Sequence, residues 1–285
     1  MTIALRTPTT TTATTTTATA TTAATSHHPA GRSTSDDVKA LPNVLRSEWI
    51  KLSSLRANKA ILGLTTATGG FVAWAVATLV TNQVQTVSEV FVFSTVLTGV
   101  IAAVAGILLF SSEAQHGTLA SVLTAQPARW VIVAAKAMMA TAFGFVLGAA
   151  GMAASVGGAV LGGLELGDAS AMAATTLWAL LFTGLSALLG LGVGMIVRHS
   201  SAAISALLVW GLVVENLLTL FLSEQVSRFL PFVAGNNLLG IVGEGAFAES
   251  AATALTRAQD ALVFGGYTAA AVLIGTVLLY RRDTN

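Results

Sequence analysis

The sequence predicts an all-α membrane protein with six transmembrane helices, and three observations support this fold class. First, 54% of the 285 residues are hydrophobic and only 9% are charged, with a mean hydropathy of +0.78, whereas soluble domains have about 25% charged residues. Second, six runs with few or no charges approach the length of about 20 residues that spans a bilayer. Third, the basic residues fall mainly in alternate connections between these runs. The chain has no cysteine, which excludes disulfides, thiolate metal sites and thiol nucleophiles.

The N-terminal 40 residues are predicted to be a disordered, threonine-rich cytoplasmic tail. Residues 7–25 read TPTTTTATTTTATATTAAT, a low-complexity sequence without apolar periodicity, which is typical of disorder. Residues 26–40 continue as polar sequence without an apolar run.

Residues 41–59 predict an amphipathic interfacial helix. Apolar side chains recur at steps of three and four residues, and basic side chains lie between them. The apolar positions are Val44, Leu45, Trp49, Leu52 and Leu55, and the basic positions are Arg46, Lys51, Arg56 and Lys59. A basic amphipathic helix of this kind lies flat in the headgroup region of a bilayer.

Residues 60–285 then form the predicted six-span domain. The spans are expected at about 60–80, 91–110, within 131–165, within 168–198, at about 201–222 and at about 261–280. Three G-x-x-x-G patterns start at Gly144, Gly158 and Gly190. Small residues let helices approach closely in lipid, so these patterns indicate packing within the bundle.

The positive-inside rule places both termini in the cytoplasm. With that orientation, 12 of the 14 Lys and Arg residues lie on the inside, and only Arg228 and Arg257 lie outside. The stretch SSEAQHGTLASVLTAQPARW, residues 111–130, is therefore the first cytoplasmic loop.

That loop predicts a short surface helix. Thr118 is a candidate N-cap after Gly117, and Leu119, Val122 and Leu123 fall on one helical face. A simple connector needs only a few residues, and this loop uses about 20, which favours a docking surface. A helical hairpin with a kink at the interface is the simpler alternative.

The outer half of the chain contains two features of interest. Glu215 is an ionisable group inside the fifth span, which is costly in a membrane and favours either a hydrogen-bonded structural carboxyl or a pathway group. Pro231 and several glycines interrupt the apolar connection 223–260, which predicts a re-entrant or surface segment that acts as a gate or as a cap. Glu215, Pro231 and Phe232 are the candidate pathway or gate residues.

No catalytic, cofactor-binding or metal-binding residues are predicted on this chain, and we do not expect an enzyme. The sequence lacks G-x-x-x-x-G-K-[ST], G-x-S-x-G and H-E-x-x-H. None of the four histidines lies in a predicted span, and Glu215 has no second deep carboxylate.

Three motifs resemble the permease family of ABC transporters known as type two. The first is R-S-E-W-x-K-L, from Arg46 to Leu52. The second and most specific is E-x-x-H-G-T, from Glu113 to Thr118, followed by Leu123, Pro127 and Lys136. The third is L-P-F, from Leu230 to Phe232. The resemblance covers about residues 41–285.

The resemblance implies a six-span subunit of the bacterial plasma membrane, in which two permease chains pair with two copies of a separate ATPase. The two permeases would be a homodimer or a pair with a second permease; ATP and magnesium would bind the ATPase, and no nucleic acid is expected. Most such systems export their substrates, and the spans favour an apolar or amphipathic one. The residues assigned to coupling are Glu113, His116, Gly117, Thr118, Leu119, Val122 and Leu123. Those assigned to the interfacial helix are Arg46, Glu48, Trp49, Lys51 and Arg56. Glu113 is expected to pair with Arg46, Lys51 or Arg56.

Other classes of protein fit the same composition. A membrane sensor or immunity subunit tied to an ATPase would need no transport, and an ion-coupled carrier or a channel would need no ATPase. An intramembrane enzyme is disfavoured because the catalytic pairs are missing.

Overall fold

A computed structural model describes residues 34–80, 86–119, 124, 128–166, 169–240 and 255–282. Within these residues every regular element is a helix, and six helices are long and apolar enough to cross a membrane, which confirms the predicted fold class. They are α2 (Arg56–Leu79), α3 (Val87–Gln115), α5 (Arg129–Leu161), α6 (Ala169–Val197), the composite α7 (Ser200–Val209), η1 (Trp210–Val214) and α8 (Glu215–Phe221), and α11 (Arg257–Arg282). The threonine-rich residues 7–25, for which disorder is predicted, lie outside the described part.

The segment predicted as an interfacial helix is helical, as part of α1 (Thr34–Ser54), but the bounds of this helix differ from the prediction. It begins at residue 34 rather than 41, so the predicted tail of 1–40 is too long, and Pro42 lies inside the helix. It ends at Ser54 rather than 59, because Leu55 is extended and the side-chain amide of Asn58 donates to the carbonyl oxygen of Leu52 at 2.9 Å. An amide donor of this kind satisfies one of the free carbonyls at a helix end.

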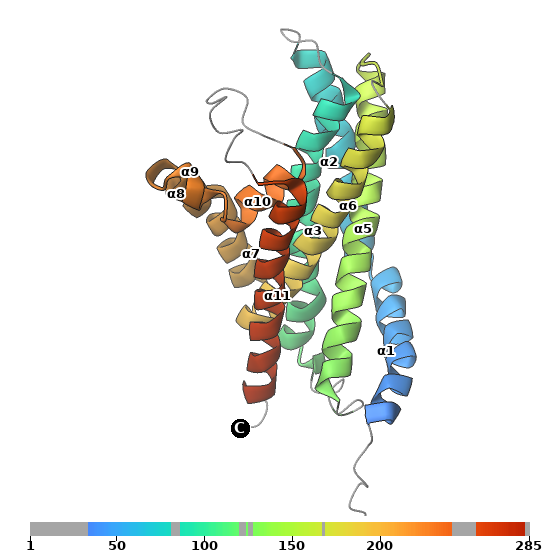
Figure 1. Cartoon of the computed structure of the whole chain (residues 1–285). Coiled ribbons are helices and arrows are strands. Elements are labelled where there is room, and N and C mark those ends of the chain that lie inside the picture. The colour runs from blue at the N-terminus through green and yellow to red at the C-terminus, as the bar shows by residue number, and fades with distance from the viewer. Residues whose placement is uncertain are drawn as a thin grey trace, which may run out of the picture.

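Helices α3, α5 and α6 pack together at the centre of the bundle, with α2 against α5 and α11 against α6 (Figure 1). Glycines make these crossings close. A Cβ atom at Gly106 of α3 would meet the carbonyl oxygen of Ala187 on α6, and one at Gly190 of α6 would meet that of Ala103 on α3. The glycines of all three G-x-x-x-G patterns face neighbouring helices of the same chain, so the prediction of packing within the bundle is confirmed.

The composite helix α7–η1–α8 angles away from the other spans (Figure 1). Only 11% of its apolar window is buried, against 61% for α5 and for α6. Its middle, Trp210–Val214, is a π-helical turn, an irregularity that is frequent at functional sites.

The outer connection contains two short helices instead of a continuous one, as Pro231 predicts. These are α9 (Glu224–Ser227) and α10 (Pro231–Leu238). Ala234 and Leu238 of α10 belong to a buried cluster with Phe182 of α6 and Phe264 of α11. Residues 241–254 of this connection lie outside the described part.

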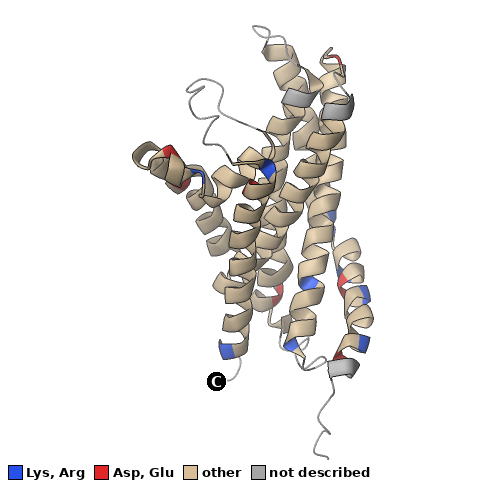
Figure 2. Ribbon diagram, viewed as in Figure 1, with Lys and Arg blue, Asp and Glu red and all other residues tan. Residues whose placement is uncertain are grey.

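The charges divide between the two ends of the bundle. The α1 helix and the C-terminal end of α11 lie at the same end, where most Lys and Arg of the described residues gather (Figure 2). Arg228 directly follows α9, and Arg257 is the first residue of α11; α9 and this end of α11 lie toward the opposite end (Figure 1). We call the α1 end the base and the α10 end the outer end.

Candidate coupling site

Four charged side chains from three helices form a closed ring at the base. Glu48 and Lys51 come from α1, Glu113 from the last turn of α3, and Lys136 from α5. Lys51 Nζ lies 2.7 Å from Glu48 Oε1 and 3.1 Å from Glu113 Oε1. Lys136 Nζ lies 3.0 Å from Glu48 Oε2 and 2.8 Å from Glu113 Oε2. Each charge therefore has two neighbours of opposite sign, and the ring is neutral.

Burial makes this ring more than a surface ion pair. Lys136 is 1% exposed and Glu48 is 5% exposed, so both charges depend on their partners. Burial alone raises the pKa of the Glu48 carboxyl, but Lys136 and Lys51 outweigh it and hold that pKa below its ordinary value. Burial alone lowers the pKa of Lys51, and Glu48 and Glu113 outweigh it and raise that pKa.

The sequence predicted one side of this ring. Lys51 was one of three candidate partners for Glu113, and it is the one that the structure selects. Within the described residues the ion pairs of Glu113 are with Lys51 and Lys136; Arg46 is exposed, and Arg56 is the exposed first residue of α2 rather than part of α1. Trp49, next to Glu48, is 53% exposed and faces away from the bundle core.

Lys136 is the member of the ring for which the sequence named no partner. The prediction counted it among the cytoplasmic charges and within the range of the third span, and it lies inside α5, where its amino group also donates to the Leu109 carbonyl oxygen at 3.4 Å. The available signal was a single lysine in an apolar run, VIVAAKAMMA, which requires an acidic partner once it is buried.

The chain turns directly after Glu113. Gly117 has a φ of +72°, a conformation that favours glycine. The His116 ring nitrogen Nδ1 lies 2.6 Å from the Ser112 carbonyl oxygen, and the Thr118 hydroxyl donates to the Glu113 carbonyl oxygen at 3.3 Å. His116 and Thr118 therefore satisfy carbonyls at the end of α3. The bonds that Thr118 would make as an N-cap involve residues 120 and 121, which lie outside the described part.

Leu119 faces the bundle. It is 7% exposed and belongs to a cluster with Phe110, Val133 and Leu279, so it anchors the loop instead of presenting an open surface. Val122 and Leu123 lie outside the described residues, and Thr124 is helical.

Further contacts fix both ends of the loop to other helices. At its start, the Ser200 hydroxyl at the beginning of α7 donates to Gln115 Oε1 at 2.6 Å. At its end, Arg129 Nη1 donates to the carbonyl oxygen of Leu279 at 2.9 Å, and its guanidinium lies 5.6 Å from the ring centre of Tyr280. The loop is thus held by α1, α7 and α11, so a displacement of the loop acts on all three.

Glu215 is also fully engaged. Its carboxylate accepts hydrogen bonds from the Trp210 indole at 3.1 Å and from the backbone N–H groups of Phe232 and Val233 at 3.0 Å. Phe232 and Val233 are in the first turn of α10, whose N–H groups lack helical partners. Glu215 therefore closes the N-terminus of α10, and Pro231 occupies the first helical position, where proline is favoured. The expected hydrogen-bonded carboxyl is present, and its partner is α10 rather than a neighbouring span.

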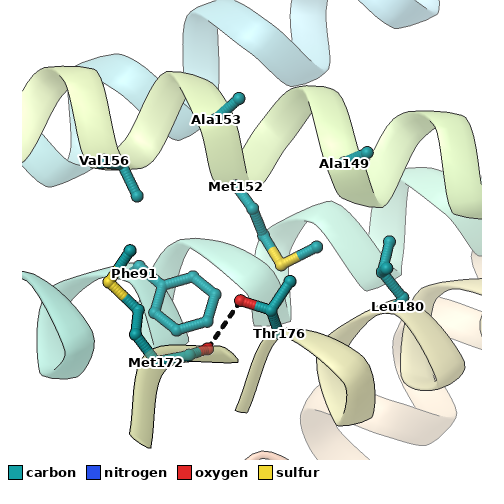
Figure 3. A pocket seen from close by; sticks show the side chains of 8 residues that line it. All are labelled: Phe91, Ala149, Met152, Ala153, Val156, Met172, Thr176 and Leu180. Carbon is teal, nitrogen blue, oxygen red and sulfur yellow. Dashed lines mark hydrogen bonds between the residues drawn. The ribbon is translucent and has the colours of Figure 1, made fainter. Parts of the chain in front are cut away.

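The cavities near these groups are apolar. One of about 360 Å³ lies between α6, α7, η1, α10 and α11, and Trp210, Pro231 and Phe232 form part of its wall. A second, of about 250 Å³, lies between α3, α5 and α6, with Phe91, Met152 and Met172 in its wall (Figure 3). Its polar side chain, Thr176, donates to the Met172 carbonyl oxygen at 2.7 Å. No charged group lines either cavity, and no cluster suited to a metal ion occurs among the described residues.

Six helices that are long and apolar enough to cross a membrane identify a multi-pass integral-membrane protein. The family model described as ABC-2 family transporter protein matches residues 8–284. The chain therefore belongs to the ABC-2 family of transporter proteins, and the resemblance inferred from its motifs is confirmed. The match begins well before residue 41, where the motif-based resemblance begins. No individual curated protein matches the chain.

Proposed function

We propose that this ABC-2 family permease subunit is the membrane part of an ATP-driven exporter, and that the loop after α3 couples it to a separate ATPase. The supporting observation is the ring Glu48–Lys51–Glu113–Lys136. It holds α1, the end of α3 and the start of α5 together at the point where the chain enters and leaves the loop.

The ring gives the base the stiffness that coupling requires. A push on a loosely held loop would be absorbed by local motion, whereas a displacement of a loop joined to α1, α7 and α11 moves whole helices. Closure of an ATPase dimer against the base would shift the balance between two arrangements of the bundle. The chain itself performs no chemistry in this scheme, and ATP and magnesium act on the partner.

We further propose a plasma-membrane location with both termini in the cytoplasm and, from the resemblance of the motifs, a pair of permease chains. The base of the bundle, where most of the Lys and Arg side chains lie, is on the cytoplasmic side under the positive-inside rule. The exposed Trp49 and Ile50 of α1 suit the interface between lipid and water. The apolar cavities favour an apolar or amphipathic substrate.

The bonds of Glu215 argue against an ion-coupled carrier. A carboxylate that binds a transported cation needs a free oxygen facing a pathway, and both oxygens of Glu215 accept hydrogen bonds from protein N–H groups.

The test is Glu113→Ala in the full chain, co-expressed and purified with its ATPase. We expect ATP hydrolysis by the complex to fall about tenfold, which corresponds to ~1.4 kcal/mol, because the end of α3 loses its ties to Lys51 and Lys136. The matched control is Glu165→Ala, which removes an exposed carboxylate at the outer end. An unchanged rate in Glu113→Ala would show that the ring takes no part in coupling.

A further inference from the structure

We infer that Ser200, at the base end, and Glu215, in the outer half, are positioning residues of a single lever, the composite helix α7–η1–α8, which joins the coupling loop to the outer helix α10. This inference rests on the proposed function, since it assigns the route by which motion at the base reaches the outer end. It makes α10 the part of the molecule that moves when the loop is displaced.

The base end of the lever is tied to the start of the loop. Ser200 is the first residue of α7, and its hydroxyl lies 2.6 Å from Gln115 Oε1 and 2.8 Å from the hydroxyl of Ser111. Gln115 is the last residue of α3 and stands two positions after Glu113. Ser200 therefore contacts the segment that the charged ring holds.

The outer half of the lever is tied to α10 at the start of α8. Glu215 bonds the first turn of α10 through the N–H groups of Phe232 and Val233, and it also accepts the indole N–H of Trp210 from the π-helical turn of the lever itself. One carboxylate thus joins the lever and α10 into one body.

The lever also packs against α3 and against Val193 of α6, mainly along its first half. Ala203 and Leu207 pack against Ala103 and Ile107 of α3, while Leu212, Leu220 and Phe221 are more than 60% exposed. The lever and α3 are therefore joined at the base and along the lever's first half. The second half reaches α10 through Glu215.

The seam between this unit and the rest of the bundle is incompletely filled. On the lever side of the 360 Å³ cavity stand Trp210 and Phe232, and on the other side stand Val193 of α6 and Tyr267 of α11. Trp210 and Tyr267 are each 45% exposed, so this cavity is an open groove, and it leaves the lever room to shift against α11. Displacement of the α3 end then tilts the lever and carries α10 away from Phe182 and Phe264.

The experiment measures two distances in the full-length complex with its ATPase in nanodiscs, with and without a non-hydrolysable ATP analogue. The chain contains no cysteine, so spin labels at introduced cysteines report without background. The outer pair is Leu220→Cys on α8 and Leu177→Cys on α6, which are 78% and 71% exposed. The base pair is Ser47→Cys on α1 and Val277→Cys on α11.

We expect the nucleotide to shift both distances in the otherwise unaltered chain. In Ser200→Ala the base pair keeps its shift and the outer pair loses it, because the lever is no longer tied to Gln115. Ser200→Thr, which keeps the hydroxyl, restores the outer shift, and the control Ser201→Ala leaves both shifts intact. In Glu215→Gln we expect a broader distribution of the distance between the two outer labels, even without nucleotide.

The outcomes separate the two proposals. If the outer shift persists in both Ser200→Ala and Glu215→Gln, the lever is overturned and coupling at the base stands. If neither pair shifts in the otherwise unaltered chain, the proposed coupling and the lever are both overturned. Loss of the outer shift in Ser201→Ala as well would also overturn the lever, because the effect would not depend on the Gln115 contact.

Discussion

Replacing Lys136 by methionine removes the most deeply buried charge of the base ring. Methionine keeps the length and most of the volume of lysine, so the packing inside α5 is conserved and the change is mainly electrostatic. Glu48 and Glu113, whose side chains are 6% and 15% exposed, then share Lys51 as their only partner from the ring. The side chain of Lys51 is 40% exposed.

The expected loss of stability follows from the difference in burial between Lys136 and Lys51. Removing one partner of a buried ion pair costs roughly 3–5 kcal/mol, since it leaves an uncompensated buried charge. Lys51 still compensates part of it, so we expect a loss of about 3 kcal/mol in the free energy of unfolding. Lys51→Met should cost no more than about 1 kcal/mol, because water already screens its charge.

Unfolding of the full chain in mixed detergent micelles, followed by tryptophan fluorescence, measures these differences. Lys59→Met, at an exposed position of α2, is the control. The double variant Glu48→Gln with Lys136→Met should cost less than the sum of the two single changes, by about 1–3 kcal/mol. A stability of Lys136→Met within about 0.5 kcal/mol of the original chain, the usual range for surface substitutions, would refute a structural role for the buried lysine.

Two further predictions concern pH and packing. Because the ring lowers the pKa of Glu48 and raises the pKa of Lys51 from their ordinary values, the attachment of α1 should be constant at intermediate pH. The attachment of α1 should weaken as the pH falls through the lowered pKa of Glu48, or as the pH rises through the raised pKa of Lys51. Spin-label distances between α1 and α5 measure this attachment, and weakening near pH 7 would contradict the ring. Gly106→Val should abolish accumulation of folded protein, because its Cβ would meet the backbone of α6. Gly157→Val, with no atom within 4 Å of a Cβ, should accumulate normally in the same expression assay, and equal yields would disprove the close crossing of α3 and α6.

The sequence was most informative where a pattern repeats along the chain. Apolar runs near 20 residues predicted all six spans, because length and hydropathy are local properties. Pro231 predicted the interruption of the outer connection, since proline begins a helix more readily than it continues one.

The sequence was least informative where partners meet across helices. Glu113 and Lys51 are 62 positions apart and Lys136 and Glu48 are 88 apart, so no local pattern reveals which charges pair. The contact of Glu215 with α10 was hidden for a different reason, because it is made to backbone N–H groups, which have no side-chain signature. The start of α1 was misjudged because residues 34–40 show no apolar periodicity in the sequence.

The most direct test of the coupling proposal is purification of the tagged full-length chain from its native membranes, followed by measurement of ATP hydrolysis in the product. We predict that an ATPase with a phosphate-binding glycine loop co-purifies in equal numbers with the permease chain, and that its hydrolysis rate falls in Glu113→Ala and is unchanged in Glu165→Ala. A permease chain that is pure, folded and free of any ATPase would contradict the proposal.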